Sequence, residues 1–422
     1  MGSLRDKLQR LDPHLPSNRT SNAEPDVAFT WKEQLAQKLG VDVLEEDNAF
    51  IFIKEQLWPV YNDSAFSYLQ EKGFISHALH SLLGFKEKQP IPLRQAVFFD
   101  LETTGLAGGT GTFAFLVGVG TVEGDAIRVR QFLLPDFNFE WLLLKHVQLL
   151  FNNYPLTVSF NGKTFDIPLL ANRFTLNRME NILDDRTHLD VLHASRRIWR
   201  HVLPTCDLQT LEKHVLGHER VDDFPGSLIP HAYFEFIKNR QVWMIREVLE
   251  HNFQDIVNMV LLTTRLAAAA EHPGKYLRTV EEQLALADYY YKTRQDDAAL
   301  PILTRLIDGE DALKPQYIPR VFFQLAMIFK RKGEPEKAVQ YLWQLVERNH
   351  FHPRVVEELA KFYEHQEKNY ALALELVNRA LERVSVLQQL TGASGTEKVV
   401  AALQHRRNRL RRRLEKATGR NS

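Results

Sequence analysis

The sequence predicts a mixed α/β domain followed by an all-helical region. Apolar runs of strand length begin at Val97, Phe113 and Ile127 and are separated by short turns, so they predict a three-stranded meander. A helical pattern, a short strand at 156–160 and a second helical pattern follow, which gives the order βββαβα. Beyond about residue 267 the strand patterns stop and amphipathic helices alternate.

The composition is that of a globular protein without a membrane segment. Of the 422 residues, 44% are hydrophobic and 25% are charged, and no apolar run is long enough to span a bilayer. Fifty-three basic residues balance fifty-three acidic ones, so any attraction for nucleic acid must come from local patches. The single cysteine, Cys206, excludes an intramolecular disulfide and a cysteine-rich zinc site. We expect a cytoplasmic protein that does not bind membranes.

A chain of this length suggests two or three domains with connecting segments. The first thirty residues are polar and rich in proline, which indicates a mobile arm. The expected segments are the mobile arm over 1–30, a lead-in helical segment over 31–92, the α/β domain over 93–267, helical repeats over 268–390, and a basic helix or tail over 391–422.

Two acidic residues stand at the end of the first strand of the meander. Asp100 and Glu102 follow the apolar run that begins at Val97, and because strand side chains alternate, both would point to the same side. Two carboxylates that converge in this way suggest a divalent-metal site. The alternative is that both are ordinary solvated residues in the loop after a strand.

Two further acids stand in contexts where they could face the same site. Asp166 opens a helical pattern just after a strand. His251 and Asp255 are four residues apart in a long helical pattern and would share one helix face. A histidine and an aspartate on a helix are, taken alone, more often surface or capping groups.

Taken in order, these residues resemble the three motifs of the ribonuclease-H-like superfamily of 3′ to 5′ exonucleases, whose sites use four metal-binding acids. The first motif corresponds to residues 99–105, the second to 161–166 and the third to His251 with Asp255. The stretches 105–112, 159–163 and 223–226 look more narrowly like the YprB-type bacterial branch. The resemblance covers about residues 85 to 267.

The resemblance implies an α/β ribonuclease-H-like fold and a two-metal phosphodiesterase. It assigns two Mg²⁺ or Mn²⁺ ions to Asp100, Glu102, Asp166 and Asp255, and a catalytic role in orienting or deprotonating water to His251. The implied substrate is a single-stranded 3′ end of DNA or RNA. The third motif departs from the family, because histidine stands at the spacing where a tyrosine is usual. The alternative is therefore an inactive ribonuclease-H-like scaffold that binds nucleic acid or protein.

The helical region resembles tetratricopeptide repeats, which would bind a protein partner. Leu-Ala pairs begin at 286, 325 and 359, at intervals of 39 and 34 residues, and aromatic residues follow each of them. A plain helical bundle with coincidental spacing is the alternative. The last part of the chain, 405–416, holds six arginines and a lysine against one glutamate. This run fits either a solvated helix end or a phosphate-binding patch.

Overall fold

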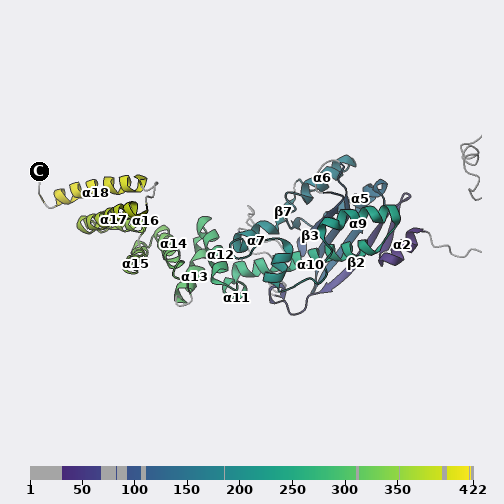
Figure 1. The fold of residues 1–422 in the computed structure, drawn as a ribbon, viewed down its shortest axis with the longest axis horizontal. Helices are drawn as coiled ribbons and strands as arrows, with labels where there is room; N and C mark the ends of the chain where they lie inside the picture. The colour runs from purple at the N-terminus through teal and green to yellow at the C-terminus, as the bar shows by residue number, and fades with distance from the viewer. Residues whose placement is uncertain are drawn as a thin grey trace, which may run out of the picture.

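A computed structural model describes residues 31–67, 82, 93–105, 111–184, 186–309, 313–350, 352–391, 397–417 and 419. The expected mobile arm over 1–30 lies outside these residues, as does most of the expected lead-in beyond residue 67. The molecule is elongated, with a sheet at one end and a row of helices that leads away from it (Figure 1).

A mixed sheet forms the N-terminal part of the described chain. Its seven strands lie in the order β1-β2-β5-β4-β3-β6-β7. The strands are β1 (Asp42–Glu46), β2 (Ala49–Pro59), β3 (Ala96–Thr103), β4 (Ala114–Glu123), β5 (Ala126–Leu133), β6 (Leu156–Ser159) and β7 (Thr187–Asp190). Neighbours from β1 to β3 are antiparallel, whereas β3, β6 and β7 are parallel. The predicted meander corresponds to β3, β4 and β5.

Helices cover both faces of the sheet, so β3 is buried on both sides. Val97 and Phe99 belong to one hydrophobic cluster, together with α5 (Glu140–Phe151), α6 (Asp166–Leu176) and α9 (Ile229–Asn239). Phe98 belongs to the opposite cluster, together with α7 (Val191–Trp199) and much of α10 (Trp243–Glu271). Strand side chains alternate, so Asp100 and Glu102 continue the Phe98 face and point toward α10.

The expectation of a helical lead-in over 31–92 is wrong for residues 42–59. The described part begins with α2 (Trp31–Leu39), but the hairpin of β1 and β2 follows and extends the sheet through β5. Asp47 and Asn48 both have positive φ, 49° and 62°, which is the backbone form of a two-residue hairpin turn. Turn chemistry and pairing with β5 therefore decide the structure of this segment.

The C-terminal part of the described chain is helical. Its helices are α11 (Pro273–Tyr276), α12 (Val280–Lys292), α13 (Asp296–Asp308), α14 (Ile318–Arg331), α15 (Pro335–Glu347), α16 (Pro353–His365), α17 (Tyr370–Thr391) and α18 (Glu397–Ala417). From α12 to α18, each helix packs against the next. The 29-residue helix α10 crosses the expected boundary at 267–268, and one hydrophobic cluster continues from the sheet into α12, α13 and α14. None of the helices described is both long and apolar enough to cross a membrane.

The basic helix α18 docks onto α16 through one buried carboxylate. The side chain of Glu364 is fully buried and accepts hydrogen bonds from Arg406 at 2.7 Å and from Arg409 at 2.7 and 2.8 Å. Arg413 lies 3.3 Å from the same carboxylate. Part of the basic run is thus used to hold the helix in place.

Candidate functional site

The candidate site begins in the second half of β3, which lies inside the sheet. Asp100 is paired in register with Gly118 of β4, and the ladder is irregular between Glu102 and Thr103. Both acids are half-buried. The strand β3 pairs with β4 on one side and with β6 on the other. Its backbone is therefore held in place, which fixes the position from which the side chains of Asp100 and Glu102 project.

Two glycines in β4 let helix α10 approach the sheet closely. A Cβ atom at Gly118 would lie 2.1 Å from the Oδ1 atom of Asn252, and one at Gly120 would lie 2.5 Å from a methyl group of Ile256. Any side chain at these positions would push α10 away from the sheet. Since α10 carries His251 and Asp255, these glycines set the distance between the acids of the helix and those of β3.

A buried chain of amide groups ties α10 to β3 and β5. Gln131 of β5 donates from Nε2 to the Leu249 carbonyl at 2.7 Å and to Oδ1 of Asn252 at 3.0 Å. Asn252, with no exposed surface, donates from Nδ2 to Oδ2 of Asp100 at 2.9 Å. These hydrogen bonds fix the distance between α10 and the sheet, and they orient the carboxylate of Asp100.

We expect Gly118→Ala to lower the free energy of unfolding by about 1 to 3 kcal/mol, because the new methyl group overlaps the buried Asn252 side chain. In the Asn252→Ala background the same substitution has room. The two changes should therefore be less than additive in a double-mutant cycle measured by urea unfolding. Full additivity would contradict this packing.

Asp166 begins helix α6 beside the same strand. The backbone N–H groups of Asp166 and Leu101 favour its ionised form, which puts this carboxylate next to β3. A Cβ at Gly162 would lie 2.8 Å from Oδ2 of Asp166, so the preceding loop also runs close to it. That loop is held by Asp190, whose carboxylate accepts from the backbone N–H of Asn161 at 2.9 Å and of Lys163 at 3.2 Å.

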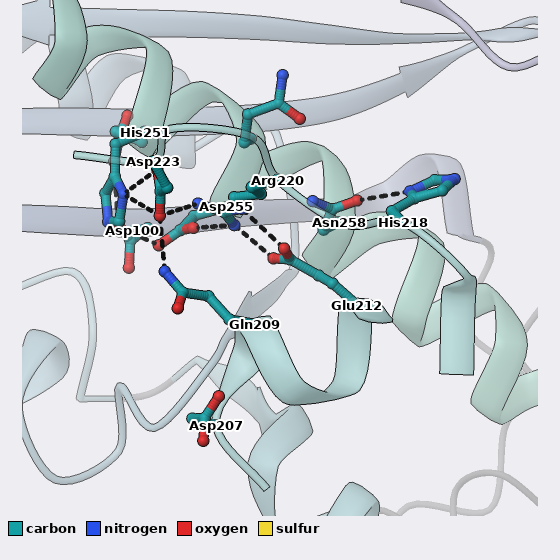
Figure 2. A network of polar contacts seen from close by, with 12 residues as sticks. Asp100, Asp207, Gln209, Glu212, His218, Arg220, Asp223, His251, Asp255 and Asn258 are labelled. Atoms are coloured by element: carbon teal, nitrogen blue, oxygen red, sulfur yellow. Dashed lines mark hydrogen bonds and ion pairs between the residues drawn. The ribbon is translucent and has the colours of Figure 1, made fainter. Parts of the chain in front are cut away.

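A charged network surrounds Asp255 (Figure 2). The guanidinium group of Arg220 donates from Nη2 to Oδ1 of Asp255 and from Nε to Glu212 at 2.7 Å, and it lies 3.3 Å from Asp223. The side chain of Glu212 is almost completely buried, so Arg220 is its counter-ion. Asp255 is thus held by a cation that belongs to the protein.

His251 lies between two carboxylates. Its Nδ1 atom is 2.9 Å from Oδ1 of Asp223, and its Nε2 atom is 3.6 Å from Oδ2 of Asp255. Gln209 holds Asp223 from another side, with a hydrogen bond of 2.6 Å (Figure 2). Asp223 is therefore positioned to orient the ring, and the spacing of four residues on α10 places Nε2 of His251 near Asp255.

The acids raise one another's pKa values. Burial raises the pKa of Asp100 well above its usual range, and the negative charges of Asp255 and Asp166 add to the effect. The pKa of Glu102 is raised well above its usual range by burial and by the charges of Asp100, Asp255 and Asp166. Burial raises the pKa of Asp166 to about 7. The four predicted acids are therefore close enough to repel one another.

The donor atoms suit a hard divalent cation, although the side chains are not arranged around one. Carboxylate oxygens are the ligands that Mg²⁺ and Mn²⁺ prefer, and the pKa values of Asp100 and Glu102 are raised by burial and by the charges of neighbouring acids, effects that a bound cation would oppose. Across the ranges that the structure describes, no three His, Cys, Asp or Glu side chains stand close enough together to hold a metal ion as they are. Asp255 would have to exchange Arg220 for such an ion.

A cavity of about 480 Å³ opens beside these acids. It is lined by Asp100, Asp255, the loop residues Phe160 and Asn161, Arg196 of α7, and residues 205–208. The cavity connects the β3 acid with the α10 acid, so a bound group could contact both.

Several residues that build the site were not expected from the sequence. Asn252 and Gln131 carry no charge, and only their burial reveals a role. Arg220 and Glu212 resemble ordinary surface charges. Aspartates next to Pro225 and Gly226 usually belong to a turn, and Asp222 does have a positive φ of 57°, but Asp223 contacts His251. The apolar residues of 207–216 recur at helical spacing, and this pattern is a signal in the sequence that Glu212 lies on an ordered element.

Comparisons with known proteins agree with this architecture. Residues 97–267 match the family described as the RNase_H superfamily. A Bacillus subtilis (strain 168) protein known as uncharacterized protein YprB is 30% identical over 414 residues, which cover 92% of this chain and 95% of that protein. The family B DNA polymerase of the archaeon Pyrobaculum calidifontis is 14% identical, with a TM-score of 0.33, over 58% of this chain and 30% of that one. That last likeness is too weak to support an argument about fold or function.

The predicted fold class, a ribonuclease-H-like α/β domain followed by a helical region, is thereby confirmed. The match over 97–267 includes all five predicted site residues. The identity to the Bacillus protein extends beyond this domain into the helical region, since it spans nearly the whole of both chains. The chain belongs to the YprB family and carries an RNase_H superfamily domain.

Proposed function

We propose that this protein is a metal-dependent 3′ to 5′ exonuclease that hydrolyses phosphodiester bonds at single-stranded ends of DNA or RNA. The observation that carries the proposal is the convergence of Asp100, Glu102 and Asp166 with Asp255 beside a cavity at the carboxyl ends of β3 and β6. These carboxylates raise one another's pKa values, which costs folding free energy and is relieved by a bound cation.

In this proposal Asp100, Glu102, Asp166 and Asp255 hold two Mg²⁺ or Mn²⁺ ions. When bound, such ions activate water and stabilise the leaving 3′ oxygen. His251 acts on the water: donation of its Nδ1 proton to Asp223 leaves Nε2 as the acceptor that faces the site. Asp223 fixes the tautomer and the ring, and Arg220 is released from Asp255 to the incoming phosphate.

A cleavage assay tests the proposal. Purified protein should shorten a 5′-labelled single strand stepwise from its 3′ end when Mg²⁺ or Mn²⁺ is present, and should not do so in EDTA. A strand with a blocked 3′ end should resist. Asp255→Asn should abolish the activity, whereas Asp308→Asn, an acid-to-amide change at an exposed position on α13, should not. Cleavage that persists in Asp255→Asn would refute the assignment.

Asp223→Asn should lower kcat by about 10- to 100-fold with little change in KM, because an amide holds His251 less firmly than a carboxylate does. In the His251→Ala background the same substitution should have almost no further effect, since its partner is gone. Steady-state kinetics on the labelled strand measures both. Equal losses in the two backgrounds would mean that Asp223 acts independently of His251.

The alternative function, an inactive scaffold, has one observation in its favour: Arg220 already provides a counter-charge for Asp255. Calorimetry with Mn²⁺ separates the two functions. An active site should bind the ion and lose that binding in Asp166→Asn, whereas a scaffold should show no binding in either protein. In both cases we propose that the helix pairs from α12 to α17 are tetratricopeptide-like repeats that bind a protein partner.

A further inference from the structure

A basic groove lies where the helical region meets the sheet domain. It runs between α7 and the helices α12 and α14, and its volume is about 770 Å³. In Figure 1, α7 lies between the sheet and α12. Five cationic side chains line it: Arg196, Arg197, Arg200, Lys292 and Arg320. Two carboxylates, Glu281 and Asp288, also line it. We call this feature the α7–α12 groove.

The groove adjoins the acidic cavity. Arg196 lines both the α7–α12 groove and the cavity that contains Asp100 and Asp255. A chain molecule that lies along the groove can therefore reach the acids at its end.

The two carboxylates of the groove are already neutralised. Asp288 accepts hydrogen bonds from Arg320 at 2.7 Å and from Gln324 at 2.6 Å. Glu281 forms an ion pair with Lys314 at 2.7 Å. Within the described residues, Arg320 is thus paired and exposed Lys292 lies 4.0 Å from Asp288, whereas Arg196 and Arg200 remain for a ligand.

The exposed arginines of α7 lack acidic partners within the described chain. Arg196 of α7 and Arg200, which directly follows the helix, are both exposed, and Nη2 of Arg200 lies 3.1 Å from Nε2 of the His201 ring. Arg197 lies over the ring of Tyr289 at 4.9 Å. A row of cations that the protein itself does not neutralise is the feature that attracts phosphate groups.

The walls of the groove are fixed relative to each other. Trp199 of α7 donates from its indole nitrogen to Glu282 of α12 at 2.9 Å, in a buried position. Both helices contribute to one hydrophobic cluster. The groove is thus part of the folded protein and needs no domain movement to form.

We propose that the α7–α12 groove binds the sugar-phosphate backbone of a single nucleic-acid strand whose 3′ end lies in the acidic cavity. This inference rests on the proposed function and adds a second contact region to it. A volume of about 770 Å³ is that of a site for a drug-sized molecule, which fits a short piece of one strand and not a duplex. The half-buried ring of Tyr317, which also lines the groove, adds a surface on which a base can stack.

A binding experiment tests the groove separately from catalysis. The anisotropy of a fluorescein-labelled oligothymidine is measured in EDTA, where hydrolysis is blocked, with the full chain and with Arg200→Glu/Lys292→Glu. Lys38→Glu/Lys238→Glu is the matched control, because both lysines are exposed, lie on α2 and α9, and give the same change in net charge. The groove variant should bind about tenfold more weakly than the control.

The salt dependence should change in the same direction. For the groove variant, the slope of log affinity against log salt should fall by about 0.7 for each phosphate that its side chains no longer neutralise, and for the control it should stay as in the wild type. Control-level affinity and slope in the groove variant would overturn the proposal. So would a blunt duplex that binds as tightly as the single strand with the same dependence on Arg200 and Lys292.

A kinetic comparison separates failure of the groove from failure of the nuclease assignment. In Mg²⁺, the groove variant should show a higher KM for the single strand, but unchanged hydrolysis of the p-nitrophenyl ester of thymidine 5′-monophosphate, which is too short to reach the groove. If the wild type binds strands through the groove but cleaves neither substrate, the nuclease assignment fails and the groove stands. Equal KM values for the groove variant and the control would refute the groove.

Discussion

Asp100→Asn should abolish metal-dependent hydrolysis and, in the same protein, raise the melting temperature measured without metal by several degrees. The asparagine can still accept the hydrogen bond from Asn252, so the contact with α10 is kept. The substitution removes a carboxyl group whose pKa is raised by burial and by the negative charges of Asp255 and Asp166. A residue that binds metal at the expense of stability is expected to behave in this way.

The effect should grow with pH. The pKa of Asp166 is raised from 3.8 to about 7, so between these values the folded protein without metal binds more protons than the unfolded chain. Stability from this group is therefore highest below about pH 4 and falls as the pH rises toward 7. The full pKa shift of Asp166 corresponds to a loss of at most about 4 kcal/mol in the free energy of unfolding. Water near the half-buried carboxylate makes the loss smaller.

Differential scanning calorimetry at pH 5 and pH 8, with and without Mn²⁺, measures these effects. Stabilisation by Mn²⁺ should be larger at pH 8 in the wild type, because the acids are then ionised, and should be nearly absent in Asp100→Asn at both values. Asp308→Asn is the control for a change of one surface charge. A lower melting temperature for Asp100→Asn in EDTA would show that Asp100 stabilises the fold and does not strain it.

Arg220→Met should lower the free energy of unfolding by about 3 to 5 kcal/mol, because it leaves the buried carboxylate of Glu212 without its counter-ion. Burial already raises the pKa of Glu212, so part of this cost will appear as uptake of a proton. Urea unfolding at pH 7 measures the loss, and at pH 5, where Glu212 is more readily protonated, the loss should be smaller.

The double variant Arg220→Met/Glu212→Met is the control for this pair. Removal of both charges replaces an ion pair by apolar groups of similar size, so most of the stability should return. Asp255 then lacks Arg220 in both variants, which separates the effect of the buried pair from any effect on metal binding. A double variant as unstable as Arg220→Met would mean that Arg220 stabilises the fold through Asp255 or Asp223 and not through Glu212.

The strands of the sheet were predictable where local pattern and burial agree. The apolar run from Val97 to Phe99 is buried on both faces, so its lack of alternation indicated a central strand. The hairpin of β1 and β2 does not follow from local pattern, because its pairing with β5 is a contact between distant parts of the chain. The turn at Asp47 and Asn48 was the local signal that could have revealed it.

The part of the site that consists of acidic residues in a recognisable order along the chain was predictable from the sequence. The acids Asp100, Glu102, Asp166 and Asp255 could be selected because their order and local contexts resemble the three motifs of the 3′ to 5′ exonucleases. Asn252 could not, since an amide in a helix is usually a surface residue, and only the approach at Gly118 buries it. The roles assigned to these residues remain predictions that the substitutions above test.

The hydrogen bond between Asn252 and Asp100 joins residues 152 positions apart, and it has a consequence for biosynthesis. During translation, Asp100, Glu102 and Asp166 emerge long before α10, so a nascent chain presents three of the acids without His251 or Asp255. The part of α10 that carries Asn252 and Asp255 must leave the ribosome before it can pack on β4 and bring the last acid into place. A chain still attached to its messenger RNA is therefore unable to assemble the site until most of the sheet domain is complete.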